Sequence, residues 1–350
     1  MTSEAPEMEL EGTILTGPAF EAVEGRLVVE DGAIAAIEET PVDSEDIVVP
    51  AFVNAHTHVG DSIAKEAGRG LSLDDLVAPP DGLKHQLLAA ASDEEKIEAM
   101  RRSLQYMAAG GTAAFLDFRE GGVSGVEAVY NASEGLAIDP VIYGRDDLAV
   151  LEIADGFGAS GARDADFEDV RAAVRAAGKP FGIHAGERDP HDVQAAIDLD
   201  PDHMVHMVHA ESDHLEQVRD REIPVVACPR SNLVTGVGLP DLQALDEHTT
   251  VALGTDNVML NSPSMFREMT FAAKCCDLDA GTVLRMATVA GAEVAGLDGG
   301  TIETGEPARL LVLDGDTDNL AGYQDPVRAV VRRAEVADVR QVVFPGTDPA

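Results

Sequence analysis

Short apolar runs alternate with amphipathic helical patterns between residues 50 and 296, and this alternation restricts the fold more than any other feature of the sequence. Seven runs read clearly as strands, and a weaker eighth lies within LEIADGFGAS at residues 151–160. The seven are AFVNAHTH, TAAFLDF, DPVIYG, PFGIHAG, HMVHMVH, IPVVACP and TVALGTD. Apolar strands that alternate with helices are typical of a parallel sheet covered on both faces. Because the segment is close to the ~250 residues of an eightfold barrel, we predict an α/β protein with a (β/α)8 TIM-like barrel.

The two ends of the chain read as short strands that cannot bury a core of their own. Residues 1–49 contain GTILTG, GRLVVEDGAIAAIEE and DIVVP, and strand-like runs return after residue 301 in ARLLVLDG, PVRAVVRRAE and VRQVVFPG. The simplest arrangement pairs the two ends in one small sheet. We therefore predict a β-domain built from residues 1–49 and 297–350, beside a barrel of residues 50–296.

The charge of the chain is extreme. It holds 64 acidic against 25 basic residues, a formal net charge of −39, and the acids are spread through helices and loops. An ordinary acidic enzyme is one explanation. Adaptation to high salt is the better one, because at ~1 M salt the Debye length falls to ~3 Å and the repulsion is screened. The composition resembles that of proteins from salt-loving archaea. Nucleic acid and anionic membranes are not expected partners, since both are negatively charged.

Nothing in the sequence reads as a targeting or membrane segment. No apolar run reaches the ~18 residues of a membrane span, and the start, MTSEAPEMELEG, is acidic. Cys228 lies in an apolar strand and Cys275 and Cys276 are adjacent in a helical pattern, so no disulfide framework is implied. We expect a cytoplasmic protein that acts on a small molecule. A homodimer is expected only from the general frequency of dimers.

Histidines and an aspartate stand at the predicted ends of four strands. His56 and His58 are two residues apart, so on a strand their side chains share a face. The other strand ends carry His184, His206 and Asp256. In a barrel such ends meet on the catalytic rim. Imidazole and carboxylate suit Zn²⁺ or Fe²⁺ with a position left for water, although each residue alone has a plainer explanation as a hydrogen-bonded group or a helix cap.

The motifs PAFVNAHTH, IHAGE, MVHMVH and ALGTDN resemble, in order, the metal-site motifs of the amidohydrolase superfamily. CPRSNL adds a likeness to the branch of cytosine deaminases, chlorohydrolases and adenosine-type deaminases. The resemblance implies a single divalent metal ion, Zn²⁺ or Fe²⁺. Its ligands would be His56, His58, His184 and Asp256. By the same resemblance Glu187 is the catalytic proton shuttle, while His206 and Asp256 hold the attacking water and accept its proton.

Local geometry adds conditions to these roles. Glu187 follows His184 by three residues and can reach the same site only if the chain turns at Gly186. His206 and His209 face opposite sides of a regular strand; the motif favours His206, and His209 is more simply a loop residue. The fourth strand segment has no lysine of the kind that bridges two metal ions in binuclear relatives, which favours one ion.

Several basic residues are candidates for substrate binding. Four arginines follow predicted strand ends: Arg119, Arg145, Arg188 and Arg230. Each has acids nearby that would neutralise it, but as a set they favour an anionic substrate, because arginine binds carboxylate or phosphate bidentately. The candidates for contact with substrate are Arg119, Arg230, Asn232, Lys84 and His85.

These features lead to a hydrolase acting on carbon–nitrogen bonds other than peptide bonds. The favoured reaction is deamination of a heterocyclic amine, with an anionic amine suggested by the arginines. Hydrolysis of a cyclic amide or a carbon–halide bond at the same site is the alternative. The intact ligand set and Glu187 argue against a binding protein with a vestigial site. Residues 59–91 should form a lid or substrate loop.

Overall fold

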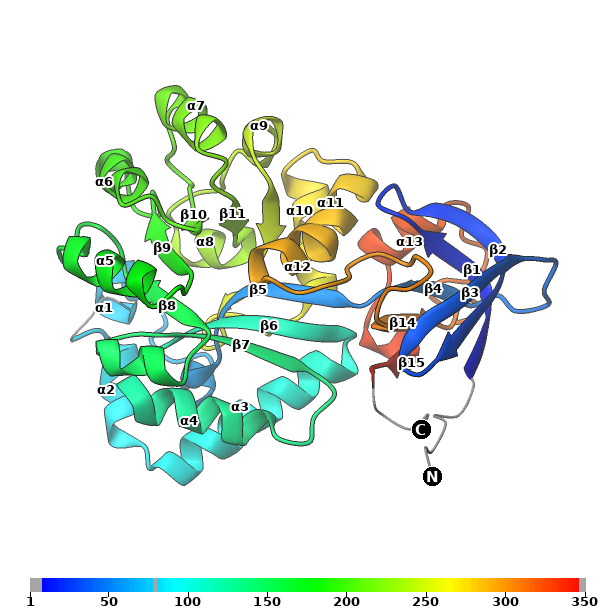
Figure 1. The fold of residues 1–350 in the computed structure, drawn as a ribbon, viewed down its shortest axis with the longest axis horizontal. Helices are drawn as coiled ribbons and strands as arrows, with labels where there is room; N and C mark the ends of the chain where they lie inside the picture. The colour runs from blue at the N-terminus through cyan, green and yellow to red at the C-terminus, as the bar shows by residue number, and fades with distance from the viewer. Residues whose placement is uncertain (1–7, 78–80, 346–350) are drawn as a thin grey trace.

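The computed structural model describes residues 8–77 and 81–345, which form a large barrel beside a small sheet (Figure 1). The barrel sheet runs in the order β12-β11-β10-β9-β8-β7-β6-β5-β13, with every pair parallel. Its strands are β5 (Phe52–His58), β6 (Thr112–Arg119), β7 (Asp139–Gly144), β8 (Gly156–Ala159), β9 (Phe181–Ala185), β10 (His203–His206), β11 (Val225–Ala227), β12 (Val251–Leu253) and β13 (Asp256–Asn257). The predicted α/β class and TIM-like barrel are therefore confirmed, including the weak eighth strand at β8.

β12 and β13 are two parts of the last barrel strand. β12 pairs with β11, whereas β13 pairs with β5, so together they connect the last strand to the first. The side-chain amide of Asn54 in β5 donates to Thr255 Oγ1 at 2.7 Å and accepts from the Thr255 backbone N–H at 2.9 Å. A Cβ on Gly254 would lie 2.7 Å from the Cβ of His56, so only glycine lets the two strands approach here. The GTD motif thus closes the barrel and delivers Asp256 next to β5.

Helices cover the outside of the barrel (Figure 1). They are η1 (Val59–Ala64), α1 (Leu73–Val77), α2 (Leu83–Ala90), α3 (Asp93–Ala109), α4 (Gly122–Ser133), η2 (Leu148–Glu152), α5 (Glu168–Ala176), η3 (Pro190–Asp192), α6 (Val193–Asp198), α7 (Ser212–Asp220), α8 (Pro229–Thr235), α9 (Leu242–His248), α10 (Met265–Cys275), α11 (Ala280–Ala287) and α12 (Val289–Ala295). Ser92 caps α3: its hydroxyl accepts from the Glu95 N–H, and the Glu95 carboxylate accepts from the Ser92 N–H. None of the described helices is long and apolar enough to cross a bilayer.

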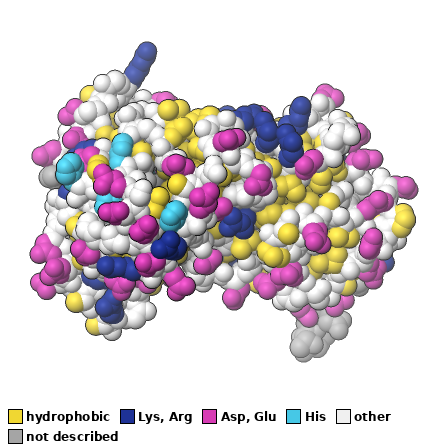
Figure 2. All heavy atoms as spheres, turned by 90° about the horizontal axis from the view of Figure 1, so that it is seen from above, with side chains coloured by type: hydrophobic (Ala, Val, Ile, Leu, Met, Phe, Trp, Pro, Cys, Tyr) yellow, Lys and Arg dark blue, Asp and Glu magenta, His cyan; other side chains and the backbone are white. Residues whose placement is uncertain are grey.

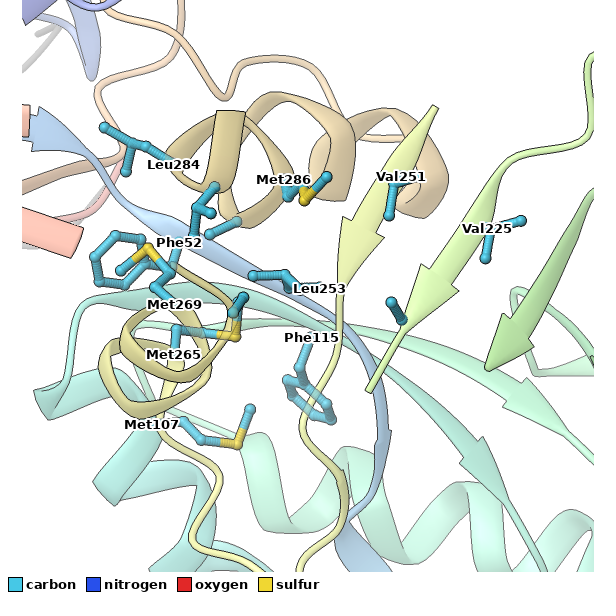
Figure 3. Packing of buried hydrophobic residues seen from close by; sticks show 14 of the residues in the cluster. Phe52, Met107, Phe115, Val225, Val251, Leu253, Met265, Met269, Leu284 and Met286 are labelled. Carbon is cyan, nitrogen blue, oxygen red and sulfur yellow. The ribbon is translucent and has the colours of Figure 1, made fainter. Parts of the chain in front are cut away.

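Most of the barrel core lies in two layers. One layer fills the space between strands and helices, where Phe52 of β5 packs edge-to-face on Phe266 of α10 with ring centroids 5.1 Å apart. Figure 3 shows buried side chains from β5, β6, α3, α10 and α11 meeting in this layer. The other layer fills the barrel interior and includes Phe118, Tyr143 and Cys228. Burial on both faces explains why the strands read as continuous apolar runs.

The small sheet joins the two ends of the chain, in the order β15-β14-β4-β1-β2-β3. Its strands are β1 (Met8–Thr16), β2 (Glu21–Glu30), β3 (Ala33–Glu39), β4 (Ile47–Pro50), β14 (Leu310–Leu313) and β15 (Val339–Val343). β14 pairs antiparallel with β4, which brings the C-terminal segment against the N-terminal one. β4 leads after one residue into β5, so the small sheet is continuous in sequence with the strand that carries His56 and His58.

One predicted strand is wrong. PVRAVVRRAE contains helix α13 (Pro326–Arg332) and turn residues instead of a strand. Asp325 caps this helix by accepting from the Arg328 N–H at 2.9 Å, and proline is favoured at a helix start because it needs no N–H partner there. The valines suggested a strand, but the cap, the proline and packing against α10 and α11 outweigh their β propensity.

Candidate active site

Two of the strand-end histidines are held in one tautomer by backbone carbonyls. His58 Nδ1 lies 3.0 Å from the carbonyl oxygen of Phe118, and His184 Nδ1 lies 2.9 Å from that of Ala159. A ring nitrogen beside a carbonyl oxygen must donate, so Nδ1 carries the proton and Nε2 keeps its lone pair. Backbone carbonyls commonly orient metal-binding histidines in this way. Each of these rings therefore presents a ligand nitrogen.

The ligand atoms of four side chains converge at the ends of β5, β9 and β13. His184 Nε2 lies 3.2 Å from His56 Nε2. Asp256 Oδ1 lies 3.4 Å from His56 Nε2 and 3.5 Å from His58 Nε2. Three imidazoles and one carboxylate are a donor set that suits a divalent transition metal with an open position. These four side chains could hold one such ion.

The hydrogen bonding of Asp256 and the pKa values of the three histidines both suit a bound cation. Asp256 Oδ2 accepts from the Ser231 hydroxyl at 2.5 Å, but the buried Oδ1 has no hydrogen-bond partner among the described residues. Burial lowers the pKa of His56, His58 and His184, which favours the neutral, metal-binding form of each ring. A buried carboxylate oxygen without a donor is costly, and a metal ion would satisfy it.

The backbone at two site residues is strained. His206 ends β10 with φ of +80°, and Asp256 begins β13 with φ of +56°, in the left-handed region that non-glycine residues rarely occupy. Such strain persists where the surrounding structure requires it, and it is concentrated at functional sites. At both positions it lets a strand end turn its side chain toward the barrel rim.

Glu187 and His206 lie together beside the cluster. The chain turns after β9 at Gly186, which has φ of +62°, so the predicted turn is confirmed. His206 Nε2 lies 3.7 Å from Glu187 Oε2, and His206 Nδ1 lies 3.0 Å from the side-chain amide nitrogen of Asn232. Burial raises the pKa of Glu187, although His206 acts in the opposite direction. The shift is in the direction that helps this carboxyl group act as a general acid.

These groups line a cavity of about 530 Å³ at the carboxyl ends of the strands. His58, His184 and Asp256 contribute to it together with Glu187 and His206. Further lining residues include the apolar Leu73, Val77, Phe157 and Phe167 and the basic Lys84, His85, Arg145 and Arg188. The size is in the range of small-molecule sites, and the lining is mostly polar and charged, with apolar side chains in the minority.

The proposed substrate contacts do not all reach this cavity. Lys84 and His85 line it. Arg119 does not: its guanidinium donates to the carbonyl and carboxylate of Glu120 and would clash with any Cβ on Gly60. Arg230 is likewise outside it. The positions of these two arginines do not support a contact with substrate.

Arg230 and Asn232 of α8 contact protein groups of neighbouring elements. Arg230 Nε donates to Glu268 Oε2 at 2.5 Å and its Nη2 donates to the Ser262 carbonyl at 2.8 Å. Asn232 is fully buried and contacts His206 rather than the cavity. Its position suits it to orient that ring. His209 lies in the turn after β10 and does not line the cavity.

The segment 59–91 contains η1, α1 and α2 and borders the cavity through residues of both α-helices. The Arg188 guanidinium pairs with the Asp74 carboxylate, which joins α1 to the loop after β9. A wall position therefore agrees with the predicted substrate loop, and its movement as a lid stays a prediction. Residues 78–80 of this segment lie outside the described residues.

Sequence reasoning missed several buried polar residues of the site. Glu120 contacts Lys84 Nζ at 2.6 Å and His58 Nδ1 at 3.5 Å, although the sequence suggested only a counter-charge for arginine. Asp117 Oδ1 accepts from the Thr57 hydroxyl at 3.0 Å and from the Val59 N–H at 2.6 Å, which fixes the turn after β5. Both residues lie at the end of β6, which is next to β5 in the barrel, and this position could have indicated that they lie near the site.

Comparison with known proteins gives consistent matches along the chain. A family model described as "Amidohydrolase family" matches residues 47–347. The chain is 34% identical to a candidate aminohydrolase of Methanothermobacter thermautotrophicus, over 96% of this chain and 97% of that protein. It is 27% identical to a 5-methylthioadenosine/S-adenosylhomocysteine deaminase of Halobacterium salinarum, over 97% of this chain and 91% of that protein. The crystal structure of an adenosine deaminase from Xanthomonas campestris with bound zinc has a TM-score of 0.77 at 19% identity, covering 97% of this chain and 91% of that one, a likeness of fold.

Proposed function

This chain belongs to the amidohydrolase family, and on that premise we propose that it is a metal-dependent aminohydrolase that releases ammonia from a heterocyclic amine. The observation that carries the proposal is the close approach of His56, His58, His184 and Asp256 beside the half-buried carboxyl of Glu187, whose pKa burial raises, at one cavity. A donor set and a general acid in the same cavity are what hydrolytic deamination requires.

The metal ion is proposed to be a single Zn²⁺ or Fe²⁺. Nitrogen and carboxylate donors suit both ions, and one ion fits because the loop after β8 supplies no lysine to bridge a second. When bound, such an ion acts as a Lewis acid that lowers the pKa of water to ~7. The zinc in the adenosine deaminase structure from Xanthomonas campestris favours zinc by analogy.

The side chains divide the proton transfers between them. Asp256 and His206 orient the attacking water and take its proton, and Asn232 fixes the His206 ring through Nδ1. Glu187 donates its proton to a ring nitrogen of the substrate, so that the water oxygen can bond to the carbon that carries the amino group. The carbon–nitrogen bond then breaks, and the amino group leaves as ammonia after it gains a proton. General acid–base help of this kind contributes typically ~10²–10⁴-fold in rate.

The substrate is proposed to be a ring with an exocyclic amine. The Halobacterium salinarum relative bears the name of a deaminase of adenosine derivatives, which makes aminopurine nucleosides the first compounds to test. The apolar side chains of Phe157 and Phe167 in the cavity suit the face of a flat heterocycle.

Ammonia release tests the proposal. Metal-loaded protein at high KCl is assayed against aminopurines, aminopyrimidines and pterins, with protein depleted by a chelator and the Glu187→Gln variant as controls. We expect stoichiometric ammonia from at least one heterocycle, none from the chelated protein, and a rate of release at least ~10²-fold lower from Glu187→Gln. Hydrolysis of cyclic amides or ring halides without ammonia from any amine would replace deamination by the alternative reaction.

A further inference from the structure

One wall of the cavity carries three cations around a single carboxylate. Glu120 Oε1 lies 2.6 Å from Lys84 Nζ and 3.5 Å from Arg145 Nη1, and its Oε2 lies 2.9 Å from Arg119 Nη2. Burial opposes the ionisation of Glu120, but these cations outweigh it and hold the pKa of the carboxyl well below its usual range. With one negative charge against three positive ones, this cluster keeps two positive charges in excess.

The nearby buried carboxyls do not supply the missing negative charge. Asp61 is fully buried, and burial raises its pKa to about 8, so it is largely neutral at pH 7. Asp117 lies farther from Arg119 than Glu120 does, at 3.9 Å, and its Oδ1 accepts from the Thr57 hydroxyl and the Val59 N–H. The excess is notable in a chain with 64 acids, where arginines such as Arg163 find a carboxylate at 2.5 Å.

Two of the three cations face the cavity. Lys84 from α2 is 3% exposed and also donates at 3.3 Å to Oδ1 of Asn257, the residue that follows Asp256. The Arg145 side chain is 12% exposed, and its contact with Glu120 at 3.5 Å is its only hydrogen bond to a described residue. A guanidinium has five N–H donors, so most of those on Arg145 lack a protein acceptor.

The other acids at the same cavity have their own partners or roles: Asp164 lies close enough to Arg163 to stabilise its charge. Asp146 accepts from the Gly121 N–H at 2.7 Å, and Asp166 accepts from the Glu168 N–H at 3.0 Å. Glu187 and Asp256 belong to the metal and proton-transfer group. Buried cations are costly unless they are paired. The N–H donors of Lys84 and Arg145 that Glu120 and Asn257 do not engage therefore call for an acceptor on a bound molecule.

We propose that the substrate carries a carboxylate or phosphate group and that Lys84 and Arg145 bind this group on the cavity wall beside the metal cluster. The proposal rests on the proposed function, since it assumes that the amine of the same molecule reaches the metal. Both ends can be reached at once because Lys84 and Arg145 line the same cavity as His58, His184 and Asp256. His85, adjacent on α2, lines the same wall and keeps its Nε2 against the Val77 carbonyl at 3.1 Å.

Because Lys84 lies on α2, the proposed anion site depends on the position of the segment that follows β5. Lys84 comes from α2, whereas Arg145 follows β7 and Glu120 follows β6. The anion site is therefore complete only when α2 lies against the barrel rim, as it does in this structure. A bound anion would join the two cations and hold α2 in that position. Charge-assisted contacts of this kind are shorter and stronger than neutral ones.

Matched pairs of amines test the proposal. Adenosine is compared with adenosine 5′-monophosphate and with adenosine 5′-carboxylic acid, so that one pair adds a phosphate and the other a carboxylate without a compensating ammonium group. Binding is measured by calorimetry on the metal-loaded Glu187→Gln variant, and KM and ammonia release on the parent, all at one KCl concentration. We expect at least one anionic member to bind tenfold or more tightly than its neutral partner.

Two variants test whether Lys84 and Arg145 cause the preference for anionic compounds. Lys84→Gln and Arg145→Gln each remove one charge of the wall, and Arg219→Gln removes one charge on α7, outside the cavity. We expect each wall variant to reduce the ratio of anionic to neutral affinity tenfold or more. The control should keep the parental ratio. Thermal unfolding of each variant shows whether it folds, and Arg145→Gln keeps the test valid if the more deeply buried Lys84 proves necessary for folding.

The two proposals fail in different ways. Ammonia released equally well from neutral and anionic members would overturn the anion site and leave the deaminase standing. Tight binding of an anionic member that is lost in the wall variants, without ammonia from any compound, would support the site and overturn the deaminase. Equal loss in Arg219→Gln would also overturn the site, since a general change in net charge would then explain the effect.

Discussion

Replacing Arg230 by methionine should destabilise the protein and leave substrate affinity intact. Arg230 Nε donates to Glu268 Oε2 at 2.5 Å, and the Arg230 backbone N–H donates to Glu268 Oε1 at 3.0 Å. Glu268 is fully buried, and burial already raises its pKa despite the arginine. Arg230→Met keeps the apolar stem and the backbone contact but leaves the buried carboxylate without its counter-charge.

The magnitude follows from this geometry. Removing one partner of a buried ion pair costs about 3–5 kcal/mol, because the remaining charge stays desolvated. At ~2–4 °C for each kcal/mol, and nearer the lower figure in a chain of this length, the melting temperature should fall by roughly 6–12 °C. The double variant Arg230→Met/Glu268→Leu removes both charges and should recover most of the loss.

The assay is thermal and urea unfolding at one KCl concentration for the parent, both single variants and the double variant, together with KM for the substrate. The account expects a large stability loss in Arg230→Met, recovery in the double variant and an unchanged KM. An unchanged melting temperature with KM raised tenfold would refute this reasoning and restore Arg230 as a substrate contact.

Three further predictions concern the acid, the surface charge and a buried carboxyl. Glu187→Gln keeps its shape and loses its proton, so turnover should fall ~10²-fold or more while metal content, measured by elemental analysis, stays at the parental level; near-normal turnover would remove Glu187 from the mechanism. The melting temperature should rise steeply between ~0.1 M and ~2 M KCl, because acidic side chains are spread widely over the surface (Figure 2) and repel one another when screening is weak; a flat profile would contradict adaptation to salt. Asp61 has a pKa of about 8 in the folded state, above its ordinary value of 3.8, so the unfolded state binds fewer protons and stability should fall as pH rises from ~4 to ~8. Asp61→Asn should lose that part of the pH dependence and gain stability relative to the parent at pH 8. Parallel pH profiles of stability for the two proteins would disprove the raised pKa.

Much of the site could be predicted because its parts are local in sequence. His56 and His58 share a strand face by spacing alone, and Gly186 signals the turn that lets Glu187 come back to the same rim. Strand ends of a parallel barrel meet by topology, so residues far apart in sequence could be grouped without knowing any contact. The same logic identified the barrel, including the short β8.

The direction of long side chains could not be predicted. Arg119 and Arg145 both follow strand ends, yet Arg119 turns behind the rim to Glu120 and Met100, whereas Arg145 faces the cavity. Which acid an arginine meets depends on packing between distant elements, as with Arg230 of α8 and Glu268 of α10. The role of Glu120 as the common partner of three cations follows from the meeting of α2, β6 and β7, and no local pattern encodes it.

The position of the metal ion tests the central claim most directly. Crystals of the metal-loaded protein are measured at the zinc or iron absorption edge, and anomalous density is compared with the four proposed ligands. The account predicts one peak for each chain, within ~2.0–2.2 Å of Nε2 of His56, His58 and His184 and of Oδ1 of Asp256. Two peaks in the cavity, or a peak bound by other side chains, would contradict the proposed single-metal centre.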